Sequence, residues 1–193
     1  MSNLNVFFLI IGLILGIVIG YIIGYLLERV KEGRLRKKSA GILKNEIEVI
    51  CEDIKKDFEY VEKFKSSEKP TNIQEERLYL SAFFFSRSVY GTSYYESYMN
   101  KIYLFQNNTQ KALISFYNDI FKIKRDIGSI RATVENMNIP NEAIKDYYEI
   151  QCKFRENALE KANFCFQELD KEKKNKIIIK FKKRTKPKTL LNM

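Results

Sequence analysis

The sequence contains no histidine, so it lacks an imidazole general base and histidine ligands for a metal ion. It also lacks a glycine-rich phosphate loop and the G-x-S-x-G pattern of a nucleophile elbow, because its glycines lie in one apolar run or stand alone. The many carboxylates alternate with lysines, which is typical of solvated helix faces. The sequence therefore predicts a protein that is not an enzyme and uses no cofactor or metal.

Cysteine is also scarce, with single residues at Cys51, Cys152 and Cys165. The number is odd, and the spacing matches no CxxC or related metal motif. We therefore expect free thiols that pack as small hydrophobic residues, as is usual in a reducing compartment.

Proline and glycine are rare in residues 26–193, which contain only three prolines and four glycines. With a hydrophobic fraction of 45%, this composition argues against wholesale disorder and favours helices. We expect an all-α fold in which a transmembrane helix continues into a cytoplasmic antiparallel bundle of about four helices, with a basic C-terminal tail.

Charge is absent from residues 6–27, a run of 22 residues. As a helix this run is about 33 Å long, which matches the hydrocarbon core of a bilayer. A cleaved signal peptide needs a basic start, a shorter apolar stretch and a small-residue cleavage site, and these are missing. The run therefore predicts an uncleaved signal anchor, a single-pass transmembrane helix preceded by a short external N-terminus at 1–5.

A basic juxtamembrane stem at 28–44 follows the apolar run, with seven Lys or Arg against two Glu. The other flank carries only the terminal amine. By the positive-inside rule, we expect the protein to lie in the cell membrane with its N-terminus outside and its C-terminal domain in the cytoplasm.

Four glycines recur at every fourth position of the apolar run, at Gly12, Gly16, Gly20 and Gly24. They form a small-residue stripe, a glycine zipper, which permits close packing of two membrane helices. Self-association and packing against another membrane helix both fit this stripe, as does the ordinary glycine content of membrane helices.

Residues 45–170 predict the cytoplasmic helical bundle. Apolar residues recur at spacings of three and four along three segments, which predicts helices with one buried face each. Their positions are Leu43, Ile47, Ile50, Ile54, Val61 and Phe64; Leu113, Phe116, Ile120, Ile123, Ile127, Ile130, Val134 and Met137; and Ile144, Tyr147, Gln151, Phe154, Ala158, Ala162, Cys165 and Leu169. The second series is a coiled-coil-like heptad that starts at a cap on Asn108 or Thr109.

Other segments of this region give weaker patterns. Thr71 and Gln74 form a capping box for a helix that ends at Gly91, and residues 93–105 fit a short helix or a strand. Gly33 and the Ser39-Ala40-Gly41 stretch are sites where the first helix is able to bend. Asp57 and Gln151 interrupt apolar stripes, and we interpret them as polar residues that fix helix register or lie at a bundle end.

Net charge is +5 in the stem at 28–44, −4 at 46–170 and +9 in the polybasic tail at 171–193. An up-and-down helix order returns this tail to the bilayer, where each Lys or Arg gains about 1 kcal/mol from anionic lipid headgroups. A solvated tail and a nucleic-acid-binding tail are the alternatives. The predicted membrane-surface residues are Arg34, Arg36, Lys37, Lys38, Lys180, Lys182, Lys183, Arg184, Lys186 and Lys188.

The anchor, the basic stem, "YES" at 95–97 and "LISFYNDI" at 113–120 give the chain a layout that resembles a diffuse set of uncharacterised prokaryotic single-pass membrane proteins with a cytoplasmic helical domain. The resemblance implies no activity. The sequence favours a non-enzymatic, membrane-anchored scaffold or adaptor that acts through protein contacts with a partner it does not identify. The alternative is a membrane tether for nucleic acid that binds through the polybasic tail.

Overall fold

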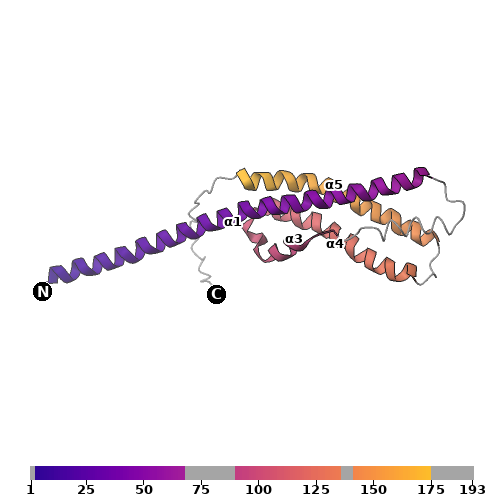
Figure 1. Cartoon of the computed structure of the whole chain (residues 1–193). Coiled ribbons are helices and arrows are strands. Elements are labelled where there is room, and N and C mark those ends of the chain that lie inside the picture. The colour runs from indigo at the N-terminus through magenta and orange to yellow at the C-terminus, as the bar shows by residue number, and fades with distance from the viewer. Residues whose placement is uncertain (1–2, 68–89, 136–140, 175–193) are drawn as a thin grey trace, which may run out of the picture. The chain divides into compact units, whose positions relative to one another are not determined.

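The computed structural model describes residues 3–67, 90–135 and 141–174, and these ranges contain helices and no strand (Figure 1). The elements are α1 (Asn3–Ser67), α3 (Ser93–Tyr98), the 3₁₀ helix η1 (Met99–Leu104), α4 (Asn107–Glu135) and α5 (Asn141–Lys174). The all-helical prediction is therefore confirmed over this part of the chain. The tyrosine-rich stretch, which fitted either a helix or a strand, forms α3 and η1.

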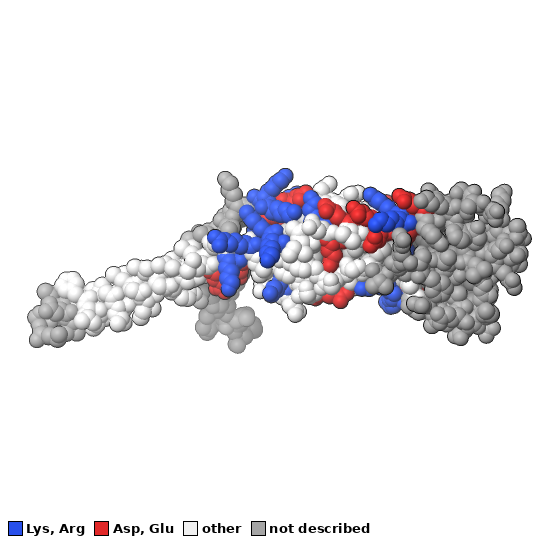
Figure 2. Space-filling view, viewed as in Figure 1, with Lys and Arg blue, Asp and Glu red and all other residues white. Residues whose placement is uncertain are grey.

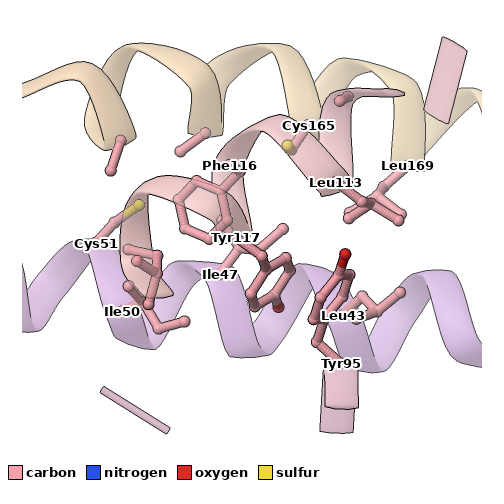
Figure 3. Close-up of a cluster of buried hydrophobic side chains, with 14 of the residues drawn as sticks. Leu43, Ile47, Ile50, Cys51, Tyr95, Leu113, Phe116, Tyr117, Cys165 and Leu169 are labelled. Carbon is pink, nitrogen blue, oxygen red and sulfur yellow. The ribbon is translucent and has the colours of Figure 1, made fainter. Parts of the chain in front are cut away.

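The chain divides into two compact units, with Arg36–Lys174 forming the larger one. The apolar N-terminal part of α1 belongs to the other unit. Within the larger unit, buried side chains on α1, α4 and α5 come together with aromatic residues from the α3 region. Figure 3 shows Leu43, Phe116 and Leu169 among the residues of this core, each contributed by a different long helix.

The buried positions follow the helical periodicity expected from the sequence. The predicted residues that are buried are Leu43, Ile47, Ile50, Ile54, Leu113, Phe116, Ile120, Ile123, Gln151, Ala158, Ala162, Cys165 and Leu169. The prediction differs at Ile127 on α4 and Phe154 on α5, which are only partly buried, and at Tyr147 on α5, which is 43% exposed. The buried face of α5 instead passes through Arg155 and continues to Glu172.

In the larger unit, later residues of α5 contact earlier residues of α1 and α4, and earlier residues of α5 contact later residues of both helices. From α1, Lys44 bonds Asp170 at 2.9 Å and Asp57 lies 3.4 Å from Arg155. From α4, Thr109 bonds Glu172 at 2.9 Å, whereas Asp126 accepts from Gln151 at 3.3 Å. Long helices whose apolar stripes meet in this way bury one face each and leave their polar faces outside.

α1 continues as a helix through Gly33 and through the Ser39-Ala40-Gly41 stretch, the two predicted sites of bending, and both Ser39 and Ala40 are fully buried. The small side chains instead allow close packing: the Tyr94 hydroxyl donates to Ser39 Oγ at 3.0 Å. A Cβ on Gly41 would meet the Lys173 side chain at 3.4 Å. The helix predicted to start at Asn108 or Thr109 begins at Asn107, and the Thr109 side chain bonds a residue of α5 instead of acting as a local cap.

Several predictions fall outside the described residues. These are the side chains of Val61, Phe64, Ile130, Val134, Met137 and Ile144, residues 71–89 of the helix predicted from Thr71 to Gly91, and the tail beyond Lys174. Tyr90 and Gly91 are described and are not helical.

Candidate functional site

The apolar part of α1 exposes its side chains along its whole length. Fifteen large apolar side chains between Phe7 and Leu27 are exposed, including Phe7 at 59%, Leu9 at 67% and Tyr21 at 77%. Among the described residues, α1 holds the one helix that is long and apolar enough to cross a membrane, and none of its most apolar stretch is buried. A core helix of a soluble protein has similar composition but is covered by its neighbours, so the exposure of this segment is consistent with membrane anchoring.

Leaving these side chains in water is costly. Full burial of a large aliphatic or aromatic side chain is worth about 1.5–3 kcal/mol, so covering fifteen of them is worth on the order of 20 kcal/mol. This exceeds the net stability of many domains. The apolar side chains of this segment therefore need an apolar environment or a binding partner to cover them, which the rest of the described chain does not supply.

The four stripe glycines lie on this exposed segment. A Cβ built on Gly12, Gly16, Gly20 or Gly24 meets no atom within 4 Å in the described part of the chain. Close packing against the described residues is therefore not the reason for glycine at these positions. In a helix interior each glycine costs about 0.8–1.0 kcal/mol relative to alanine in water. The four glycines therefore lower the stability of the helix, and no contact with the described residues compensates for this loss.

The predicted membrane-surface residues have different environments. Arg34 and Lys38 are exposed, and Lys37 is half-buried. Arg36 is also half-buried, with its Nε 3.3 Å from Glu172 Oε2 on α5. The remaining six, Lys180, Lys182, Lys183, Arg184, Lys186 and Lys188, lie outside the described residues.

A buried ionic cluster connects α1, α5 and the segment that precedes α3. Arg155 is fully buried, and Asp57 and Tyr90 are 5% and 1% exposed. The Tyr90 hydroxyl donates to Asp57 Oδ2 at 2.6 Å. The Arg155 Nε donates to the Tyr90 oxygen at 3.1 Å and lies 3.4 Å from the same Asp57 oxygen. Burial raises the pKa of Tyr90 far above its ordinary value, so the phenol stays protonated and continues to donate.

Gln151 extends this cluster to α4. Arg155 Nη1 donates to the Gln151 side-chain oxygen at 3.0 Å and to its carbonyl oxygen at 3.2 Å. The amide nitrogen of Gln151 donates to Asp126 Oδ2 at 3.3 Å. Asp57, Tyr90, Gln151 and Arg155 bond to one another, so the geometry favours a role in fixing helix register over binding a ligand. Sequence analysis singled out Asp57 and Gln151 for this role, and the structure brings both onto Arg155.

Two carboxylates cap helices that are distant in sequence. Glu46 on α1 accepts the backbone N–H groups of Tyr94 and Tyr95 at 2.8 and 3.2 Å, at the start of α3. Glu172 on α5 accepts the Gln106 N–H at 2.6 Å and the Thr109 hydroxyl at 2.9 Å, at the start of α4. Carboxylates at these ends satisfy free N–H groups and oppose the positive end of the helix dipole.

The cysteines behave as structural residues. None of the three forms a disulfide, and Cys51 and Cys165 are buried. Burial raises the pKa of Cys51 to about 11 and that of Cys165 to about 12. Because the thiolate is the nucleophile, these two thiols are poorly reactive at neutral pH. In the described residues no group of three or more Cys, Asp or Glu side chains is placed to hold a metal ion.

Sequence reasoning missed Arg155, Tyr90, Glu46 and Glu172. Arg155 and Glu172 do fit a periodic pattern, because Arg155 lies three residues before Ala158 and Glu172 three residues after Leu169. Arg155 was not singled out because charged side chains are rarely buried, and Glu172 fell within the segment assigned to the polybasic tail. Glu46 and Tyr90 carry no such signal, since their partners lie on other elements.

Comparison of the chain with protein-family models, curated proteins and solved structures found no match. No relative therefore supplies a function, and the chain's own residues must indicate one.

Proposed function

We propose that this protein is a single-pass, membrane-anchored helical scaffold or adaptor that acts through protein contacts on the cytoplasmic side. The observation that carries the proposal is the exposed, uncharged segment from Phe7 to Leu27, which lies on the same helix as part of a packed helical unit. Its length suits one bilayer crossing. The basic residues that follow it favour a cytoplasmic location for the larger unit.

The larger unit is suited to presenting surfaces. Many of its buried polar groups bond to one another, as in the cluster around Arg155. We propose that the helix predicted between Thr71 and Gly91 completes an antiparallel bundle with α1, α4 and α5. A rigid bundle on a membrane stem is an arrangement that supports binding of a second protein and requires no chemistry of its own.

The glycine stripe supports association within the membrane. Gly12, Gly16, Gly20 and Gly24 face open space in the described chain. Small residues at this spacing allow helix backbones to approach closely, with gains in dispersion. We propose that this face packs against a second copy of the chain, and packing on a different membrane helix is the alternative outcome.

The proposal is tested first by location and orientation. The full chain is expressed with a C-terminal fluorescent protein or a C-terminal alkaline phosphatase, which report cytoplasmic and external ends respectively. We expect fluorescence, no phosphatase activity, and an intact chain in the membrane fraction. Phosphatase activity, or a chain shortened by removal of its N-terminal segment, contradicts the orientation or the uncleaved anchor.

Partners are then sought by crosslinking in native membranes, with the full chain compared with a variant that lacks residues 175–193. Crosslinked proteins captured by both chains support the scaffold. If only the full chain is crosslinked to nucleic acid, the alternative function, a membrane tether for nucleic acid, is favoured. In that function the polybasic tail, with a net charge of +9 over residues 171–193, binds the phosphate backbone.

A further inference from the structure

The 3₁₀ helix η1 exposes apolar side chains although both of its ends are fixed. Met99 is 44% exposed and Tyr103 is 67% exposed. Immediately outside these positions, Tyr98 and Phe105 are buried, with ring centroids 5.7 Å apart. Phe105 also closes η1 with a backbone bond to the Ile102 carbonyl at 3.1 Å. Met99 and Tyr103 are therefore held outward by a fixed turn of backbone.

Contacts on both sides of η1 lead to the first residues of the larger unit. Before η1, the Tyr94 hydroxyl bonds Ser39, and the Tyr94 ring stacks on Tyr98 at 5.7 Å. After η1, the Gln106 N–H bonds Glu172, which pairs with Arg36. η1 thus lies at the end of the larger unit that contains Arg36 and Ser39.

This end is tethered to the apolar segment by a short stretch of chain. Nine positions separate Leu27 from Arg36, and a chain of that length spans at most about 30 Å even when fully extended. If Leu27 lies at the bilayer surface, the end that carries η1 stays within reach of the headgroups.

The charge of this end complements an anionic surface. The exposed cations are Lys38, Lys101, Lys173 and Lys174, together with Lys171, which pairs with Glu168. Figure 2 shows blue side chains gathered where α5 ends. The nearby carboxylates are already in ion pairs: Glu172 with Arg36, Asp170 with Lys44, and Glu168 with Lys171. Exposed lysines beside an exposed tyrosine and methionine are typical of a segment that lies in a membrane interface.

We propose that η1 is a second membrane contact, in which Met99 and Tyr103 enter the headgroup region of an anionic bilayer and Lys101 pairs with lipid phosphate. This deepens the proposed function and rests on it, because the anchor must hold the unit at the membrane. The contact would limit rotation of the helical unit about its stem and so fix which of its faces a partner meets.

The chain has no tryptophan, so one introduced indole reports one position. The full chain carrying Tyr103→Trp is reconstituted in vesicles of phosphatidylcholine with phosphatidylglycerol, and in matched vesicles of brominated lipid. The matched control is Tyr147→Trp, at a partly exposed tyrosine near the start of α5, far along that helix from Glu172. We expect blue-shifted emission and roughly twofold quenching by bromine for the Tyr103→Trp chain, as for a side chain at interfacial depth. Little change is expected for the Tyr147→Trp chain.

Removal of phosphatidylglycerol, or the added change Lys101→Glu, is expected to reduce quenching in the Tyr103→Trp chain. Met99→Trp serves as a second probe if Tyr103→Trp alters the circular dichroism spectrum. The proposal is overturned if the protein remains in the vesicle fraction but the indole at both probe positions emits in the red and is not quenched. That result would leave the proposed anchor intact. Emission that shifts only in native membranes, and not in lipid vesicles, assigns η1 to a protein partner and also overturns it. Failure of the anchor itself is recognised separately, because the protein then leaves the vesicle fraction.

Discussion

Arg155 Nε lies 3.4 Å from Asp57 Oδ2, although the two residues are 98 positions apart in sequence and both side chains are buried. Tyr90 and Gln151 also bond the guanidinium, through its Nε and Nη1 respectively. A buried pair of this kind is costly to form but more costly to break, because removal of one partner leaves a charge without compensation. It therefore specifies one register of α1 against α5.

Replacing either partner alone destabilises the larger unit. We expect Arg155→Met to lower the free energy of unfolding by about 3–5 kcal/mol, because Asp57 then lacks its buried counter-charge. The double variant with Asp57→Asn is expected to lose less than the sum of the single variants, by about 1–3 kcal/mol. Urea unfolding of the full chain in micelles measures all three.

The exposed pair Asp53–Lys56 on α1, at 3.4 Å, is the matched control for this cycle. Its coupling is expected to be below about 0.5 kcal/mol, as for other exposed ion pairs. Equal coupling energies for the two pairs would show that the buried cluster does not fix register.

The carboxylate of Glu172 caps α4 across the bundle. Glu172→Ala removes the acceptor for Gln106 N–H and Thr109 and leaves Arg36 without its partner. We expect a loss of about 1–3 kcal/mol and faster hydrogen exchange in the first turn of α4. Glu156→Ala, at an exposed position of the same helix, is expected to leave this exchange unchanged. Slower or equal exchange in the Glu172 variant would rule out the capping role.

A substitution at Gly41 tests whether this position serves helix packing or acts as a hinge. A Cβ there makes only an ordinary contact with the end of the Lys173 side chain, at 3.4 Å. We expect Gly41→Ala to stabilise the larger unit by about 0.5–1 kcal/mol, because alanine lowers the entropic cost of the helix. Ala40→Leu, at a fully buried neighbour, is expected to destabilise it by about 1–3 kcal/mol through overpacking. Thermal unfolding of both variants checks the contrast, and destabilisation by Gly41→Ala would favour a flexible joint.

Alkaline pH is expected to unfold the larger unit. The pKa of Cys51 rises to about 11 and that of Cys165 to about 12, each from an ordinary value of 9.0. Burial also raises the pKa of Tyr117, whose hydroxyl donates to Glu46 at 2.6 Å. Groups with raised folded pKa values stay protonated in the fold while the unfolded chain ionises. Stability is therefore full below about pH 9 and falls as the pH rises toward 12.

Thermal midpoints measured between neutral and alkaline pH test this expectation. The variant with Cys51→Ala and Cys165→Ala should show a shallower decline than the parent chain, even if it is less stable at neutral pH. An identical slope would mean that these thiols do not contribute to the linkage.

The glycine stripe makes a prediction about the membrane. Gly16→Ile together with Gly20→Ile blocks close approach of two backbones, so crosslinked dimers of the full chain in membranes should decrease by about tenfold, corresponding to roughly 1.4 kcal/mol. The control is Leu15→Ile with Ile19→Leu, which preserves volume on a neighbouring face. If both variants crosslink like the parent chain, the glycines do not form a self-association face.

The long-range order of the fold was only partly accessible from the sequence. Periodic apolar residues such as Leu43 and Ile120 predicted buried helix faces because that signal is local and repeats every three or four residues. Glu46 and Glu172 were missed because a cap supplied by another helix depends on tertiary geometry. Arg155 was not singled out because a charged side chain is rarely buried, and only the proximity of Asp57 and Tyr90 makes its burial favourable. The Ser39-Ala40-Gly41 stretch was interpreted as a weak point for the same reason, since the neighbours that need small residues lie far along the chain.

The decisive question is whether the residues before Arg36 alone hold the protein in the membrane. The full chain and a chain that begins at Arg36 are each expressed, and the membranes are washed with alkaline carbonate to remove peripheral proteins. We expect the full chain to stay in the pellet, whereas the shortened chain is soluble and helical by circular dichroism. Release of the full chain into the supernatant, or retention of the shortened chain in the pellet, would contradict the proposed anchor.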